Sequence, residues 1–347
     1  MTDQVGIFQH AVGSRRDPAH GYCVDDVARA LQVDLLHGRV LGWAAVADSA
    51  WRGFRFLAEA FDAGSGRFGN FRSVDGTWIG GIGSEDSHGR AVLALGDVAA
   101  VAPDGPLVDA ASSLLIHALP AAHEFTSPRA EASVVLGCAA MLGPTPGGTP
   151  AAMLELLGTR LHGRFRLRAT VAWPWPEDVL TYENALLPRA LIAAGRRLGS
   201  DLMTDTGLDT LDWLIEAQTS SEGHLSPIGN GWWPRDGDRS RFDQQPIEAT
   251  ALILAAKSAH AATRDDRYRV AIERSYAWFL GANDSGLRVA DPERGACKDG
   301  LTPRGVNANE GAESTLMWLM ASEHTRATRD ANALPARPTE FLATSIS

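Results

Sequence analysis

The sequence predicts an all-α fold in which a ring of buried helices is surrounded by a ring of amphipathic helices. Ala/Leu-rich segments with acidic starts recur six times, and a repeat of two helices and a long loop has this kind of period. The segments between them carry apolar residues on one face only. The reference acids of the six starts lie 45 to 65 residues apart, at Asp26, Asp86, Glu131, Glu183, Glu248 and Glu313.

The six segments with acidic starts are predicted to be the inner helices. In the fifth of them, residues 249–256 are apolar nearly all round, which is typical of a helix buried on every side. The starts read, in chain order, GYCVDDVARAL, GSEDSHGRAVLAL, SPRAEASVVLGC, TYENALLPRALIAAG, QQPIEATALILAA and NEGAESTLMWLM.

The amphipathic segments between these starts are predicted to be the outer helices. In residues 107–119, for example, Leu107, Ala111 and Leu115 share one face at helical spacing. After Ser322 the periodicity weakens, so residues 323–347 are predicted to be a last outer helix and a loose tail of one domain, 1–347. The other predicted outer helices are 47–62, 151–163, 207–218 and 267–281.

Strand signals are sparse. Residues 66–81 are predicted to form a small β-hairpin, because Val74-Asp75-Gly76-Thr77 is a turn between alternating, aromatic segments. Long loops rich in Gly, Pro and Trp occupy 173–178, 223–246 and 290–309, and loops of this length are usually functional. Each of them precedes an inner helix, so the loops and the acidic starts are expected at the same end of the ring, around a cleft.

Composition narrows the classes of partner. A formal net charge of −10 argues against nucleic acid, which needs clustered Lys and Arg. The three cysteines form no CxxC or Cys/His cluster, so no metal site is predicted, and no cofactor motif is present. No basic start with an apolar core and no membrane-spanning run is found, so a cytoplasmic protein without membrane contact is expected.

Acids in the first turn of a helix are stabilised by free N–H groups, so capping explains any one of these acids alone. Several of them, however, stand beside loop aromatics, and this combination is how proteins hold sugars. Glycosidic bond cleavage needs two carboxyl groups on opposite sides of the bond, which we expect from different repeats. The candidate catalytic residues are Asp25, Asp26, Glu85, Asp86, Glu183, Asp243, Glu248 and Glu310. Glu131, whose preceding loop is short and lacks Trp, is assigned to capping.

Aromatic and polar residues near the predicted mouth are the candidate sugar contacts. Core packing and loop capping are the alternatives for each of them. They are the aromatic residues Tyr22, Trp78, Trp173, Trp175, Tyr182, Trp232 and Trp233, the histidines His10, His20 and His88, and the polar residues Asn70, Arg72, Arg235, Gln244, Gln245, Asn307 and Asn309.

The segments GIFQHAVGSRRDPAHGYCVDDVARAL, GSEDSHGRA, FDQQPIEA and CKDGLTPRGVNANEGAEST together resemble a bacterial family of (α/α)6 toroid proteins. The resemblance spans residues 6–321 and departs from the family at Val27, where an Asn is expected. It implies a six-hairpin architecture like that of certain glycosidases, and carbohydrate chemistry. Members also occur attached to glycosyltransferases, so it further implies a functional link to such an enzyme.

The leading hypothesis is a glycoside hydrolase that cleaves an oligosaccharide or polysaccharide. Its catalytic pair is expected from repeats that face each other, either Asp26 with Glu183, or Glu85 or Asp86 with Glu248. One alternative is a sugar epimerase, isomerase or phosphorylase, in which histidines move protons or arginines bind phosphate. Another is a glycan-binding module without activity that serves a glycosyltransferase. The arginines considered for phosphate are Arg235, Arg239, Arg241 and Arg304.

Overall fold

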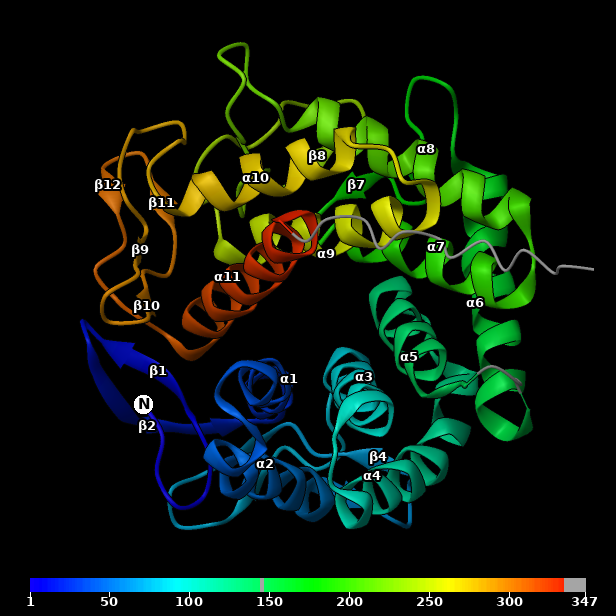
Figure 1. Cartoon of the computed structure of the whole chain (residues 1–347), viewed down its shortest axis with the longest axis vertical. Coiled ribbons are helices and arrows are strands. Elements are labelled where there is room, and N and C mark those ends of the chain that lie inside the picture. The colour runs from blue at the N-terminus through cyan, green and yellow to red at the C-terminus, as the bar shows by residue number, and fades with distance from the viewer. Residues whose placement is uncertain (144–146, 334–347) are drawn as a thin grey trace, which may run out of the picture.

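The computed structural model of the chain describes residues 1–143 and 147–333, and it contains a closed ring of inner helices (Figure 1). Consecutive inner helices pack against one another, and the last packs against the first, which closes the ring. The inner helices are α1 (Val24–Leu41), α3 (Glu85–Val101), α5 (Pro128–Met141), α7 (Leu186–Leu198), α9 (Pro246–Thr263) and α11 (Ala312–Ala333).

Within residues 1–143 and 147–333, five outer helices alternate with the inner helices and lie outside the ring (Figure 1). The predicted all-α double ring is therefore confirmed. Residues 323–333 of the predicted last outer helix instead continue α11, and residues 334–347 lie outside the described residues. The outer helices are α2 (Ala47–Ala60), α4 (Gly105–Ala118), α6 (Gly148–Arg168), α8 (Asp201–Ala217) and α10 (Arg267–Phe279), with short 3₁₀ turns at Trp43–Ala45 and Leu119–Glu124.

Inner helices are mostly buried because neighbouring inner and outer helices pack against them. The closest approach is between α3 and α5, where a Cβ added to Gly96 would lie 2.2 Å from the carbonyl oxygen of Gly137. Only two glycines allow backbones to come this close. No helix among residues 1–143 and 147–333 has the length and apolar character needed to cross a bilayer.

At the starts of these inner helices, the N-cap position is occupied by a residue other than the acids. The side chains of Ser84 and Ser127 cap α3 and α5 by accepting backbone N–H groups, and Cys23 precedes α1 without a side-chain cap. The acids of these first turns therefore are not the N-caps, and their side chains are available for contacts with other helices.

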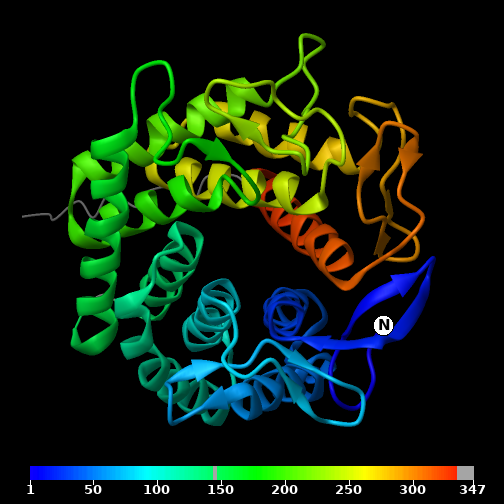
Figure 2. The same ribbon diagram turned by 180° about the vertical axis from the view of Figure 1, so that it is seen from behind.

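Short strands lie over the ring, on the face towards the viewer in Figure 2. The predicted hairpin is confirmed as β5 (Phe71–Arg72) and β6 (Trp78–Ile79), but it belongs to a four-stranded sheet of order β1-β2-β5-β6. Its other half, β1 (Phe8–Val12) and β2 (Arg15–Cys23), was not predicted, because the exposed, polar residues of β2 hide the alternation. The remaining pairs are β3 (Phe61–Asp62) with β4 (Arg67–Phe68), β7 (Val179–Leu180) with β8 (Trp233–Pro234), β9 (Ala290–Asp291) with β10 (Ala296–Cys297), and β11 (Leu301–Thr302) with β12 (Gly305–Val306).

Candidate active site

Two buried arginines each join two carboxylates at the N-terminal end of the inner helices. Arg90 of α3 places Nε 3.3 Å from Asp25 Oδ2 and Nη2 2.5 Å from Glu183 Oε2. Arg29 of α1 places Nη1 2.9 Å from Asp26 Oδ1 and Nη2 2.8 Å from Glu313 Oε2. Residues from the first, second, fourth and sixth repeats thus meet at one place. We call this group the acid cluster: Asp25, Asp26, Arg29, Arg90, Glu183 and Glu313.

The neighbours Asp25 and Asp26 face different partners, as expected for consecutive residues of a helix, which point about 100° apart. Asp25 contacts Arg90 on α3, whereas Asp26 contacts Arg29 on its own helix, beside Glu313 of α11. One acidic dipeptide therefore contributes a carboxylate to each of the two arginine bridges.

Asp26 has the most perturbed environment in the acid cluster. Its side chain is 5% exposed. Burial raises its pKa to about 7, the charges of Glu313 and Asp25 act in the same direction, and Arg29 opposes them. Asp26 therefore holds a proton at much higher pH than an exposed aspartate does, as a general acid must.

Glu183 has a left-handed backbone, with φ of +47°, although it is not a glycine. Glu248 holds this turn, since its carboxylate accepts a hydrogen bond from the backbone N–H of Glu183 and another from Asn184 Nδ2 at 3.2 Å. Burial raises the pKa of Glu248 to about 7. Strained backbone of this kind costs on the order of 1–3 kcal/mol and collects at functional sites. Glu248 therefore orients Glu183 towards Arg90.

Replacing Glu183 by Gly and by Ala separates the effect of its backbone conformation on stability from the effect of its carboxylate. Both changes remove the ion pair with Arg90, but only Gly adopts a positive φ freely, so Glu183→Gly should be about 1 kcal/mol more stable than Glu183→Ala. Urea unfolding measures the difference. Equal stability of the two variants would show that the turn relaxes without cost.

A pocket of about 250 Å³ opens beside the acid cluster. Drug-sized ligands occupy roughly 300–1,000 Å³, so this pocket suits a small ligand. Among residues 1–143 and 147–333, no group of three or more His, Cys, Asp or Glu side chains is arranged to hold a metal ion. The pocket is lined by Gln9, His10, Cys23, Asp25, Asp26, Arg29, Gln245, Asp299, Gly311, Glu313 and Ser314.

The acids of the second repeat connect neighbouring helix starts. Glu85 accepts hydrogen bonds from the backbone N–H groups of Thr126 and Ser127, at 2.8 and 2.7 Å. Asp86 accepts hydrogen bonds from Ser127 Oγ at 2.8 Å and from the hydroxyl of Tyr182. Glu85 therefore stabilises the start of α5, and Asp86 with Tyr182 joins α3 to the loop that carries Glu183.

The remaining candidate acids lie outside the acid cluster. Glu310 forms ion pairs with Arg294 at 3.0 Å and Lys298 at 2.9 Å, which lower its pKa against the effect of burial. Asp243 is exposed and has a φ of +58°. Glu131 is fully buried and pairs with two arginines of the outer helix α6, so it stabilises the packing of α5 on α6 and is not a cap.

The predicted cleft tryptophans are mostly core residues. Trp175 is 0% and Trp173 5% exposed, so both rings lie in the core and not at the surface of the predicted cleft. Trp173 packs edge-on against Trp213 and Trp233, at ring-centroid distances of 5.4 and 5.3 Å. These loops fold back onto α8, because large aromatic rings contribute most to stability when their apolar surface is buried. Trp232 is 44% exposed.

Three further predicted contacts are buried in structural roles. His88 lies edge-on between Phe68 and Phe125, and burial lowers its pKa to about 3. The hydroxyl of Tyr22 donates to Asp3 at 2.6 Å. Gln244 is also fully buried and accepts the indole N–H of Trp278 at 2.9 Å.

The other predicted contacts are spread around the mouth. His10 and Gln245 line the pocket, and exposed His20 lies edge-on to His10 at 4.6 Å. The remaining contacts are half-buried. Trp78 packs on Phe56, Arg72 forms an ion pair with Glu59, and Arg235 donates to Arg168 O, all on the outer helices. Asn70 O accepts a hydrogen bond from the N–H of Val24, at the start of α1. In the last long loop, Asn307 Oδ1 accepts from Asn309 N–H, and Asn309 Oδ1 accepts from Gly13 N–H.

Sequence reasoning missed the arginines and Glu313 as site residues. Arg29 and Arg90 stand in helices that are otherwise apolar on most faces, and a buried arginine on such a helix needs a carboxylate partner. That signal was available in VDDVARAL and DSHGRAVLAL. Glu313 is acidic in the first turn of α11, whereas Glu310 was the residue of this repeat among the predicted catalytic candidates.

Comparisons with known proteins show which solved structures share the fold of this chain. No protein-family model and no curated protein matches the sequence. Among solved structures, the chain is similar to a cellobiose 2-epimerase from Spirochaeta thermophila (TM-score 0.69, 13% identity, covering 95% of this chain and 91% of that one). It is also similar to a sugar epimerase from a ruminal bacterium (TM-score 0.72, 11% identity, 94% and 93%).

A third similar structure is a GH76 α-mannanase from Bacteroides thetaiotaomicron (TM-score 0.61, 10% identity, 89% and 88%). At sequence identities of 10 to 13%, the structural similarity shows the fold alone. The chain therefore has the (α/α)6 toroid fold of these proteins.

Proposed function

We propose that this protein is a carbohydrate-active enzyme, and that it is a glycoside hydrolase acting on a short oligosaccharide. The observation that carries the proposal is the position of Asp26. Its carboxyl group has a pKa of about 7, and the guanidinium of Arg29 lies between it and a second carboxylate, that of Glu313. All three residues line the pocket of about 250 Å³. Pairs of carboxyl groups in which one is protonated are the usual means of glycosidic cleavage.

In the proposed reaction, protonated Asp26 gives its proton to the glycosidic oxygen as the bond to the anomeric carbon breaks. Glu313, whose side chain is 38% exposed, takes a proton from water while the water oxygen adds to that carbon. Arg29 contacts both carboxylates and holds their orientation. The pair is thus Asp26 with Glu313, in place of Asp26 with Glu183 from the sequence.

Glu183 and Asp25 are proposed to act through Arg90. Both carboxylates are within 3.3 Å of the guanidinium of Arg90, so they fix the position of this positive charge next to the pocket. The burial of this ion-pair group and the strained backbone at Glu183 favour a positioning role.

A sugar epimerase is the second candidate, favoured by one observation. His10 lines the pocket and lies edge-on to His20, with ring centroids 4.6 Å apart. One neutral histidine can take a proton from the carbon next to a sugar carbonyl, and a second, protonated histidine can give a proton to the other face of that carbon. Phosphorolysis through the loop arginines has less support, since Arg239 donates to Ala217 O at 2.7 Å and Arg241 binds Asp284 at 3.0 Å.

Incubation with a panel of α- and β-linked disaccharides in D₂O distinguishes these reactions. Hydrolysis is expected to release monosaccharides without deuterium on carbon, which mass spectrometry and NMR detect. Epimerisation would give an isomer of unchanged linkage with deuterium on carbon. Saturable binding of a disaccharide without any product would contradict both enzymes and favour a glycan-binding module.

A further inference from the structure

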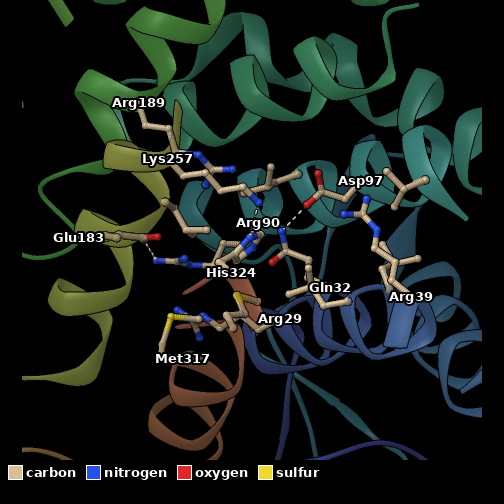
Figure 3. Close-up of a pocket in the computed structure, with 17 residues that line it drawn as sticks. Arg29, Gln32, Arg39, Arg90, Asp97, Glu183, Arg189, Lys257, Met317 and His324 are labelled. Carbon is tan, nitrogen blue, oxygen red and sulfur yellow. Dashed lines mark hydrogen bonds and ion pairs between the residues drawn. The ribbon is translucent and has the colours of Figure 1, made fainter. Parts of the chain in front are cut away.

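A second cavity, of about 220 Å³, lies along the ring axis behind the acid cluster (Figure 3). Arg29, Arg90 and Glu183 line one end of it. Towards the other end, the lining residues come from α1, α3, α7, α9 and α11. They include four basic side chains, Arg39, Arg189, Lys257 and His324, and one carboxylate, Asp97.

The cations of this axial cavity lack the bridging carboxylates that the acid cluster has. Asp97 accepts a hydrogen bond from Gln32 at 2.6 Å, and Lys257 Nζ lies 2.8 Å from His324 Nδ1. Among residues 1–143 and 147–333, no carboxylate lies within ion-pair distance of Arg189 or Lys257, although the charges of Asp97 and Glu183 act on Arg189 from farther away. Arg189 Nε is buried without a hydrogen-bond partner. Arg189 and Lys257 extend side by side into the cavity in Figure 3.

Helix dipoles do not account for this grouping. Arg39 is in the last turn of α1, where a cation is favourable, but Arg189 is in the first turn of α7, where it is not. Lys257 stands in the middle of α9. Burial and the neighbouring Arg189 and Arg39 lower the pKa of Lys257 to about 8. The chain therefore keeps like charges together at a cost that an anion would remove.

We propose that the axial cavity binds a small oxyanion, a phosphate or the phosphate group of a phosphomonoester, through Arg189 and Lys257. The planar fork of Arg189 suits two oxygens of such a group, and Lys257 supplies a point charge. The cavity has room for the anion and several water molecules. The proposal is independent of the proposed function, because it concerns binding and not turnover.

Isothermal titration calorimetry with sulfate, inorganic phosphate and glucose 6-phosphate tests the site in the full chain. One saturable site is expected, and Arg189→Gln and Lys257→Gln should each weaken binding about ten-fold or more, as for a lost charge-assisted hydrogen bond. Arg166→Gln, on the exposed last turn of α6, is the matched control and should bind as the unmodified protein does. Tighter binding of glucose 6-phosphate than of phosphate would identify a phosphomonoester as the occupant, and the reverse would identify free phosphate.

The pH dependence of sulfate binding gives a second readout, since sulfate keeps its charge over this range. Lys257 loses its proton near pH 8, so affinity should fall above that pH in the unmodified protein and not in Lys257→Gln. The groups around Lys257 are Arg39, Asp97, Arg189 and His324. No saturable binding of any of the three anions, or an equal loss in Arg166→Gln, would overturn the proposal. Circular dichroism of each variant shows that it is folded.

Discussion

Asp26→Asn is expected to lower kcat/KM by roughly three orders of magnitude, the size of effect that general acid–base catalysis gives. Asparagine keeps the size of the side chain and its contact with Arg29, but it has no proton to give to a leaving oxygen. The measurement is the hydrolysis rate of the best disaccharide, with circular dichroism to show that the fold is kept.

The pH profile separates a catalytic from a structural role for Asp26. Because the pKa of Asp26 is about 7, the protonated form is lost as pH rises through 7, and activity should fall on that side. The residual activity of Asp26→Asn should lack this decline. Asp266→Asn, an exposed change at the start of the outer helix α10, is the control and should keep full activity. Full activity in Asp26→Asn would remove Asp26 from the mechanism.

Arg90→Met should lower the free energy of unfolding by about 3–5 kcal/mol, the range for breaking a buried ion pair from one side. The change leaves Asp25 and Glu183 without their shared cation, and the side chain of Glu183 is 10% exposed. Burial alone would lower the pKa of Arg90, but the charges of Glu183 and Asp25 outweigh it and hold the pKa far above its usual range, so the guanidinium is charged at every pH tested.

Urea unfolding of Arg90→Met is best compared with Arg168→Met, which breaks an ion pair between the two exposed side chains of Arg168 and Asp178. A surface pair contributes about 0–1 kcal/mol, so the control should lose little. Adding Glu183→Gln to Arg90→Met should recover part of the loss, because it removes one uncompensated charge. A loss below about 1 kcal/mol in Arg90→Met would contradict the bridging role of Arg90.

Much of the ring was predictable, because helical periodicity and all-round apolar segments report burial directly. The fourth inner helix shows where that reasoning stops. Its acidic start suggested a helix beginning at Glu183, whereas α7 begins at Leu186, after a turn in which Glu183 has a positive φ. That turn is held by Glu248, which is 65 residues away, so no local pattern predicts it.

The candidate site was predicted less completely, because side-chain direction depends on tertiary contacts. Acids from the first, fourth and sixth starts do meet, and the predicted residues Asp25, Asp26 and Glu183 are in the acid cluster. Loop position alone, however, could not show that Trp173 turns into a core of other tryptophans. The identity of Arg29 as the bridge to Glu313 follows only once α11 is seen beside α1.

The closure of the ring between α1 and α11 has a consequence for how the protein is made. Asp26 is synthesised before its partner Glu313 and the pocket residue Ser314, which come from α11. A chain on the ribosome lacks both until α11 has emerged, so the small pocket is completed only when all six inner helices are present. Copies cut before α11 should therefore lack activity however well their first helices fold.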